Sequence, residues 1–198
     1  PASVHLCDWP VPDEAMLNRR LIEETDAVMK VVRLGRSARN SAGMKVRQPL
    51  AKFTVKPASN LEREAVIKNE RLILDELNIK SLVLEEDAAK LVKRALKPNF
   101  AVMGPKFGKI MPKIQKALSM EDTNELAAKI LAGESAHLTV DGETVELEAS
   151  DVTVEMVTPE NISAAEEAGT VVAVDTALTP ELVQEGLVRD LVRQIQNM

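Results

Sequence analysis

The sequence contains only one cysteine, Cys7, among its 198 residues. A single thiol excludes an internal disulfide, so we expect a protein of a reducing, cytoplasmic compartment. No uninterrupted apolar run is longer than five residues, whereas a bilayer span needs about 20. No basic and then apolar leader precedes the first globular segment, and we therefore expect neither a membrane helix nor a secretory signal.

Aromatic residues are also scarce, at 2% of the chain, and tyrosine is absent. The aromatic set is Trp9, Phe53, Phe100 and Phe107. Single-stranded nucleic acids are usually held on several aromatic rings, on which successive bases stack. A platform of that kind is therefore not predicted, although arginine guanidinium planes can also stack on bases.

The residue patterns that carry catalysis or metal binding are missing as well. The two histidines, His5 and His137, are far apart in sequence, and no pair of carboxylates is placed as a general acid and base. His5 is close to Cys7 and Asp8, but a structural zinc site usually takes four ligands in spaced pairs. The sequence predicts no metal site and no active site in this chain.

One glycine-rich stretch, Gly104 to Lys109, resembles a phosphate-binding loop. It has three residues between its glycines and an isoleucine after its lysine, whereas the nucleotide-binding motif has four residues and then a serine or threonine. We interpret the stretch as a turn at the start of a helix. Such a turn can still bind a phosphate through free N–H groups and through Lys106 or Lys109.

What the sequence does contain is a strong separation of charge within a net charge of -6. Residues 1–119 hold 22 of the 25 lysines and arginines but only 14 of the 31 acids, so that this half carries +8. Residues 120–198 hold 3 bases and 17 acids and carry -14.

Two tracts within the basic half contain no acid at all. The first lies between Asp26 and Glu62 and contains Lys30, Arg33, Arg36, Arg39, Lys45, Arg47, Lys52 and Lys56. The second lies between Asp87 and Glu121 and contains Lys90, Lys93, Arg94, Lys97, Lys106, Lys109, Lys113 and Lys116. Such tracts are typical of polyanion binding, and a nucleic acid is the commonest polyanion. A second interpretation stays open, in which both tracts are solvated faces balanced by the acidic half.

The first part of the chain favours a single long helix from residue 13 to about residue 42. Asp13 is its expected N-cap, and Gly43 follows its expected end. At 100° per residue, the apolar and basic positions fall on opposite sides. The apolar face consists of Val28, Val31, Val32 and Leu34. The basic face consists of Lys30, Arg33, Arg36 and Arg39.

From residue 46 the pattern changes to short strands that alternate with helices, which predicts an α+β fold with βαβ-like units. Strands are predicted at 46–55, 79–84, 100–103, 138–140, 145–147, 152–157 and 171–177. Helices are predicted at 60–77, at 85–96, from the Gly104–Gly108 turn to 118, at 121–131, and from an N-cap at Thr179 onward. Asp141-Gly142 between alternating segments predicts a β-hairpin.

Several short segments follow one another in a distinctive order. They are Ser3–Leu6 with Trp9-Pro10, Arg36–Leu50, Asp75–Ile79, Lys97–Phe100, Gly104–Gly108, and Leu178–Leu187 followed by Val192–Gln196. Each segment alone is weakly specific, but their joint order covers nearly the whole chain. In this order the chain resembles isoleucyl-tRNA synthetase, a class I aminoacyl-tRNA synthetase.

The resemblance implies a place in a larger enzyme that joins isoleucine to its tRNA with ATP and Mg²⁺. It implies that residues 1–43 are the terminal helix of the anticodon-binding helix bundle. Residues 44–198 would form the α+β C-terminal junction domain, cut within its last helix. Because the sequence begins with Pro1 rather than Met and ends inside a predicted helix, we expect a fragment of a longer chain.

The resemblance also implies what this chain lacks. The two ATP-binding signatures of class I enzymes, His-Ile-Gly-His and Lys-Met-Ser-Lys-Ser, are absent, as is an editing domain. With one cysteine, the chain resembles the branch of the family without a zinc module. We therefore expect a fragment that is inactive alone and has no cofactor of its own. Its expected partners are the anticodon stem-loop of the isoleucine tRNA and the rest of the synthetase chain, with no membrane and no DNA.

Contacts with tRNA are predicted at the bases of the two acid-free tracts, because phosphates position an RNA and its splayed bases give identity. The predicted contacts are Lys30, Arg33, Arg36, Arg39, Lys45 and Arg47, and secondly Lys106, Lys109 and Lys113. Two other functions stay open. One is a protein-interaction module whose acidic half docks a basic partner, and the other is an enzyme with its own small-molecule site.

Overall fold

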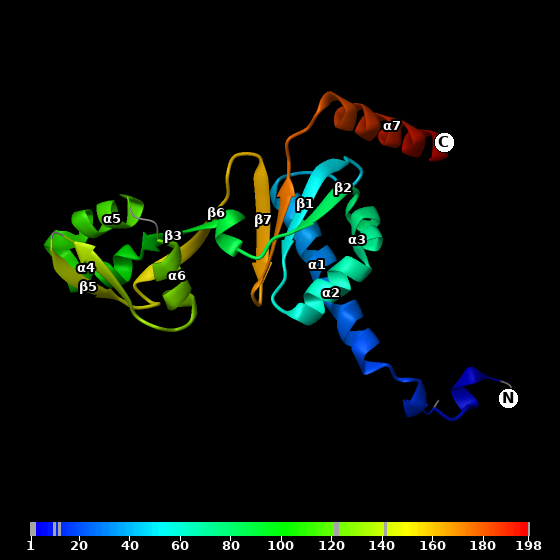
Figure 1. The fold of residues 1–198 in the computed structure, drawn as a ribbon, viewed down its shortest axis with the longest axis horizontal. Helices are drawn as coiled ribbons and strands as arrows, with labels where there is room; N and C mark the ends of the chain where they lie inside the picture. Colours follow the sequence, from blue (N-terminus) through cyan, green and yellow to red (C-terminus); the bar gives the residue numbers. More distant parts are fainter. Residues whose placement is uncertain (1–2, 10, 12, 121–122, 141, 198) are drawn as a thin grey trace.

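A computed structural model describes residues 3–9, 11, 13–120, 123–140 and 142–197. Within this part of the chain, buried side chains gather in two cores. The first core surrounds a four-stranded sheet together with the long N-terminal helix, and the second lies in a smaller lobe formed by residues in the middle of the chain (Figure 1).

The long helix α1 spans Arg19–Ser41 and begins later than the sequence predicts. The side chain of Asn18 caps it by accepting a hydrogen bond from the Leu21 N–H at 3.0 Å. Asp13, the predicted N-cap, instead caps a short 3-10 turn over Glu14–Met16. The predicted helix is therefore correct in its body and wrong at its start.

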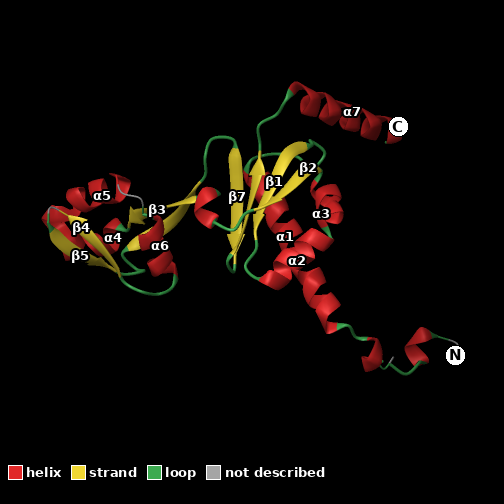
Figure 2. Ribbon diagram, viewed as in Figure 1, coloured by secondary structure: helices red, strands yellow, loops and turns green. Residues whose placement is uncertain are grey.

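The main sheet has the strand order β2-β1-β8-β7. Figure 2 shows its strands in yellow, with β1, β2 and β7 labelled. Its strands are β1 (Leu50–Lys56), β2 (Ile79–Leu84), β7 (Ile162–Glu167) and β8 (Thr170–Asp175). β1 and β2 pair in parallel, with Phe53 opposite Leu82, and the other pairs are antiparallel. Helices α2 (Asn60–Lys68) and α3 (Glu70–Leu77) connect β1 to β2. This confirms one predicted βαβ unit, with its helix divided at Asn69.

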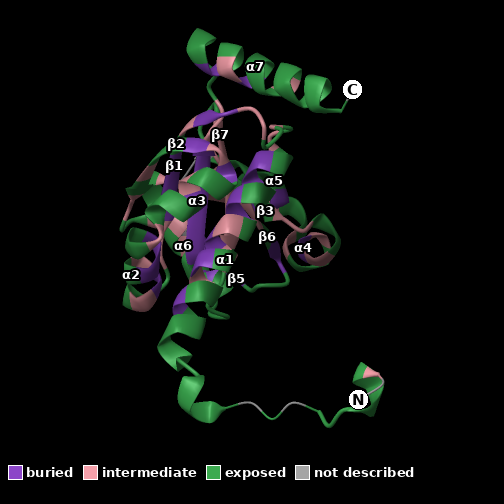
Figure 3. Ribbon diagram, turned by 90° about the vertical axis from the view of Figure 1, so that its right-hand side faces the viewer, coloured by how far each residue is buried: buried purple, intermediate pink, exposed green. Residues whose placement is uncertain are grey.

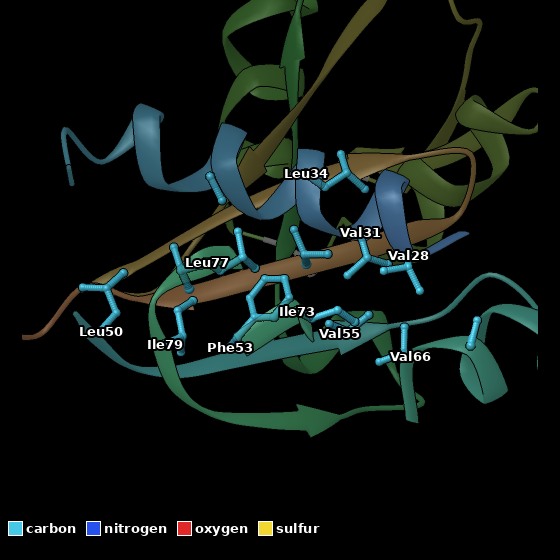
Figure 4. Close-up of a cluster of buried hydrophobic side chains, with 14 residues drawn as sticks. Val28, Val31, Leu34, Leu50, Phe53, Val55, Val66, Ile73, Leu77 and Ile79 are labelled. Atoms are coloured by element: carbon cyan, nitrogen blue, oxygen red, sulfur yellow. The ribbon is translucent and has the colours of Figure 1, made fainter. Parts of the chain in front are cut away.

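The first core forms where α1 packs on the sheet (Figure 4). Val28, Val31 and Leu34 are buried, as the apolar periodicity of the helix predicts. They share one core with Phe53 of β1 and Leu77 of α3. The core therefore runs across residue 43, where the sequence changes from helical to strand-like periodicity.

The smaller lobe is built on an antiparallel pair of strands, β3 (Lys93–Pro98) and β6 (Val152–Val157). Its other elements are α4 (Phe100–Phe107), α5 (Met111–Met120), α6 (Asn124–Leu131), β4 (Ala136–Val140) and β5 (Glu143–Leu147). β4 and β5 form the predicted hairpin, with Leu138 opposite Val145. Arg94 on β3 donates two hydrogen bonds of 2.8 Å to Glu166 on β7, which ties this lobe to the main sheet.

Two predicted elements in this lobe are wrong. The predicted helix 85–96 is a 3-10 turn over Ala88–Lys90 followed by β3, and the predicted strand 100–103 is the start of α4. Val92 and Leu96 are buried at a spacing of four, which is also the spacing of a helix face. Residues 93–98 nevertheless form a strand, because they pair with β6, which lies more than 50 residues later in the sequence. β7 was not predicted, because its run of alanines and glutamates carries little strand signal.

The last helix, α7, spans Pro180–Gln196 and begins, as predicted, at an N-cap on Thr179. It lies at the edge of the fold and is exposed along most of its length (Figure 3). Gln48 attaches it by donating from Nε2 to the Leu182 carbonyl at 2.7 Å, and Lys80 pairs with Glu185 at 2.6 Å. No helix in the described part of the chain is long and apolar enough to cross a membrane.

Close packing at Gly35 gives a testable prediction about the first core. A Cβ at this position would lie 2.6 Å from Leu77 Cδ1 and 3.1 Å from Phe53 Cζ. We expect Gly35→Ala to lower the free energy of unfolding by up to about 2 kcal/mol, because overpacking costs about 1–3 kcal/mol and the better helix propensity of alanine returns about 1 kcal/mol. Urea denaturation measures this change. Ser37→Ala is the control, because Ser37 is exposed on the same helix and alanine favours a helix. Equal stability of the two variants would contradict the prediction.

A second prediction concerns Glu24, a buried carboxylate on α1. Lys68 and Arg20 donate hydrogen bonds to it at 2.7 and 3.0 Å, and these bonds hold its pKa below the ordinary value of 4.5. A lowered pKa stabilises the fold above pH 4.5, and this contribution is lost as the pH falls through the folded pKa. The stability difference between the unaltered chain and Glu24→Gln should therefore shrink between pH 6 and pH 3, as followed by urea denaturation. Glu23→Gln, at an exposed neighbour, should show no such convergence.

Candidate nucleic-acid interface

The acidic half of the chain folds back on the basic half. Arg33 on α1 pairs with Glu167 on β7, Arg47 with Asp190 on α7, and Lys106 on α4 with Asp151, at 2.7 to 2.8 Å. Glu166 and Glu155 pair with Arg94 and Lys97 in the same way. Much of the charge separation seen in the sequence is therefore neutralised within the molecule, and this favours the second interpretation for the paired bases.

Lys30, a predicted tRNA contact, is part of the internal packing. Its Nζ lies 3.0 Å from Oε1 of Glu62, whose side chain is 3% exposed. Thr170 donates its hydroxyl to the same carboxylate at 2.8 Å, and the Ala58 N–H donates to it at 2.7 Å. Lys30 thus compensates a buried negative charge between α1 and α2, and a phosphate would have to compete with that carboxylate.

The prediction that Arg39 lies on an exposed basic face is wrong. Arg39 is completely buried, because the connection between α1 and β1 folds over the last turn of the helix. Its Nη2 donates to the backbone carbonyls of Lys45 and Gln48, while its Nε and Nη1 have no hydrogen-bond partner among the described residues. Burial lowers the pKa of Arg39 from its ordinary value. Arg39 thus stabilises the connection between α1 and β1.

Arg33 and Arg36 remain at the surface, where they border an open groove. The groove has a volume of about 920 Å³ and lies along α1 beside α3. Its lining includes Met29, Val32, Arg33, Arg36, Ser37, Asn40, Leu72 and Glu76. Arg36 pairs with Glu76 across the groove, and both side chains are about half exposed.

The ion pairs at this groove are exposed and therefore weak. The side chain of Arg33 is 60% exposed and that of Glu167 is 44% exposed. The hydrogen bond between them raises the pKa of Arg33 and lowers that of Glu167, so both stay charged near neutral pH. Exposed pairs of this kind contribute only about 0–1 kcal/mol. The arginines can accordingly exchange a carboxylate for a phosphate at little cost.

Lys45 and Arg47 lie in the connection between α1 and β1. Lys45 is exposed, and no acidic partner of its ammonium is found in the described ranges. Arg47 donates from Nε to Asp190 at 2.8 Å, with both side chains partly exposed. Lys45 is thus available to an external anion, whereas Arg47 also helps to hold α7.

The second predicted group lies on the other lobe (Figure 1). Lys106 donates hydrogen bonds to Asp151 and Glu148 at 2.8 and 3.0 Å, and these bonds raise the pKa of its ammonium. Lys109 and Lys113 are exposed near the start of α5. The structure therefore places the nine predicted residues in two groups, one on α1 and its following connection and one on the smaller lobe.

The glycine-rich stretch is not the predicted turn at a helix start. Gly104 and Pro105 lie inside α4, and only Gly108, with a φ of 41°, forms a turn, between α4 and α5. His5, Cys7 and Asp8 are all exposed. Among the residues that the structure describes, no group of three or more His, Cys, Asp and Glu side chains is arranged to hold a metal.

Sequence reasoning missed two kinds of residue. The buried carboxylates of Glu62 and Asp151 look like ordinary surface acids in the sequence, although Ser59 and Glu62 have the spacing of a helix-capping box. Phe100 was not proposed as a contact, yet the residue is 58% exposed. Its position within an acid-free tract was the available signal.

The chain is similar to several curated proteins over almost its whole length. It is 44% identical over 195 residues to the isoleucine–tRNA ligase of Deinococcus radiodurans and 39% identical over 194 residues to that of Thermus thermophilus. It is 38% identical over 196 residues to that of Clostridium tetani. These matches cover 98–99% of this chain and 18% of each ligase. A comparison with protein-family profiles finds no match.

Proposed function

Because this chain is related to isoleucine–tRNA ligases over almost its whole length, we propose that it is a tRNA-binding part of such a ligase. The complete enzyme would join isoleucine to its tRNA with ATP and Mg²⁺ in the cytoplasm. The observation that carries the proposal is the similarity over 98% of the chain, at up to 44% identity. The chain spans about 18% of the curated relatives it matches, so the larger activity belongs mostly to residues outside it.

The groove along α1 is the proposed place of contact with the anticodon stem-loop. Arg33 and Arg36 would bind phosphates after leaving their exposed carboxylate partners, and Lys45 would bind a third. Ser37 and Asn40 line the same groove and can form hydrogen bonds with base edges. A guanidinium plane can also stack on a splayed base, which suits a surface with few aromatic rings.

ATP and Mg²⁺ would be bound elsewhere in the ligase. Neither class I ATP signature occurs in the sequence, and among the described residues no group of three or more His, Cys, Asp and Glu side chains could hold a metal ion. We therefore expect the purified chain to catalyse no isoleucine-dependent exchange of pyrophosphate into ATP. A rate of exchange that rises with the chain's concentration would contradict this expectation.

The rest of the ligase chain is the second proposed partner. α7 presents Leu187, Leu191 and Ile195 on one side, each more than half exposed, and α1 exposes Met29 in the same way. Contiguous exposed apolar residues usually mark a contact surface. Since these ligases are more than five times longer than the matched segment, their remaining residues can cover these faces.

Direct binding tests the proposal. The 198-residue chain is titrated into fluorescently labelled isoleucine tRNA at low salt, and anisotropy is measured. Saturable binding that unlabelled isoleucine tRNA reverses is expected, with weaker competition by a tRNA whose anticodon is altered. The same experiment separates the alternative of an acidic module for a basic protein, which predicts no shift. That alternative is disfavoured by the ion pairs of Glu166, Glu167 and Asp190 with bases of this chain.

A further inference from the structure

Phe100 is exposed although it lies in a well-packed lobe. Phe53 is fully buried in the first core, and Phe107 packs against the second. Phe100, at the first position of α4, leaves 58% of its surface exposed. Burial of an apolar ring is favourable, so an exposed ring beside a groove is available to a ligand.

The ring borders a groove between β3 and α5. The groove has a volume of about 750 Å³, which is large enough for a nucleotide. Leu96 and Leu118, both nearly buried, form part of its floor. The exposed residues of its lining, which we call its rim, include Phe100, Lys93, Lys97, Gln115 and Ser119.

The polar side chains of the rim match the parts of a nucleotide. Lys93 is exposed and has no acidic partner among the described side chains. Lys97 pairs with Glu155 at 2.6 Å, but the two side chains are 65% and 43% exposed, so that the pair can exchange. Gln115 is an exposed amide that can both donate and accept, as the edge of a base requires. The two cations suit a phosphate on either side of that base.

We propose that this groove binds an unpaired nucleotide of RNA, with the base stacked on the ring of Phe100 and its two flanking phosphates near Lys93 and Lys97. A paired base cannot present its face to the ring, so the ligand is a single-stranded segment. The inference rests on the proposed function in taking the RNA to be tRNA. It adds a second contact surface, on the lobe that does not contain α1.

Three substitutions at one position test the stacking. The chain is titrated into a labelled six-nucleotide single-stranded RNA, with a fully paired RNA hairpin stem as the comparison. Phe100→Trp should retain or tighten binding, whereas Phe100→Leu and Phe100→Ala should both weaken it roughly 5- to 150-fold, the range for loss of one base stack. If Phe100 made only a hydrophobic contact, without stacking, the Phe100→Leu variant would bind the single-stranded RNA as tightly as the unaltered chain does. That result would overturn the inference.

A matched pair of lysines tests the phosphate. Lys93→Ala should weaken binding of the single strand and flatten its salt dependence by about 0.7, the value for one phosphate of a single strand. Lys129→Ala is the control, because Lys129 is also exposed and without an acidic partner in the described chain, but lies on α6 outside the groove. Equal effects of the two substitutions would show general attraction only and would overturn the inference.

The outcomes separate this inference from the proposed function. If Phe100→Ala binds both RNAs as the unaltered chain does, while tRNA binding is intact, the groove is not a base site and the proposed function stands. If the unaltered chain binds the single strand through Phe100 but does not bind isoleucine tRNA, the proposed function fails. Absence of single-strand binding would overturn the inference whatever tRNA does. Photo-cross-linking of a 4-thiouridine RNA to the unaltered chain, followed by mass spectrometry of the peptide that contains Phe100, gives a readout without substitutions.

Discussion

Replacing Arg39 by alanine is expected to lower the free energy of unfolding by about 3–5 kcal/mol. The guanidinium of Arg39 is fully buried and donates to the carbonyls of Lys45 and Gln48. A hydrogen bond to a charged group contributes roughly 1.5–3 kcal/mol, and the variant also leaves a cavity. Part of the loss is offset, because the buried charge has no acidic partner in the described structure and its removal ends a desolvation cost.

Urea denaturation of three variants measures this role. Arg36→Ala is the exposed control on the same helix, and we expect it to change stability by less than about 1 kcal/mol. Arg39→Lys keeps the charge but replaces the planar guanidinium, whose Nη2 donates to both carbonyls, by an ammonium on a differently shaped side chain, so its stability should fall between those of the other two. If Arg39→Ala and Arg36→Ala are equally stable, the connection after α1 is held by other contacts.

Arg39 is not a suitable position for testing RNA contacts. A variant of Arg39 would lose affinity through unfolding or through movement of the residues that follow α1, including Lys45. Loss of binding in such a variant is therefore no sign of a contact. Arg33 and Arg36 are better targets, because both are exposed and neither is part of the buried network around Glu62.

Local patterns in the sequence were sufficient for several elements. The apolar spacing of Val28, Val31 and Leu34 predicted the buried face of α1. Asp141-Gly142 predicted the hairpin of β4 and β5, although Asp141 itself lies outside the described residues. The Thr179-Pro180 start predicted α7. In each case the residues that decide the structure are within a few positions of one another, so the sequence carries the complete signal.

Elements that depend on distant partners could not be predicted in this way. β3 is a strand because it pairs with β6, although Val92, just before the strand, and Leu96 are buried at a helical spacing. The candidate site could not be predicted for the same reason, because the lysine and arginine residues of α1 cannot be told apart by their positions in the sequence. Lys30 pairs with the buried carboxylate of Glu62, and Arg39 donates to the backbone carbonyl of Gln48, while Arg36 stays at the surface. Only the folded chain distinguishes these environments.

Removal of both Arg33 and Arg36 should flatten the salt dependence of tRNA binding. Each neutralised phosphate releases counterions and contributes about -0.7 to -0.9 to the slope of log K against log salt. The double alanine variant should therefore have a slope smaller in magnitude by about 1.4–1.8 if both arginines bind phosphates. Anisotropy titrations of labelled isoleucine tRNA over a series of salt concentrations give this slope.

The control variant removes the same amount of positive charge, but from positions outside the groove. Arg63 and Arg189 are also partly exposed and pair with Glu86 and Glu185. Their double alanine variant should keep the slope of the unaltered chain, because the total charge is the same but no groove phosphate is lost. If one groove arginine reads a base instead, the slope changes less, while discrimination against an altered anticodon falls by about 1–3 kcal/mol. Identical slopes, affinities and discrimination in both double variants would show that the α1 groove is not the tRNA contact. The RNA-binding role would then rest on the smaller lobe.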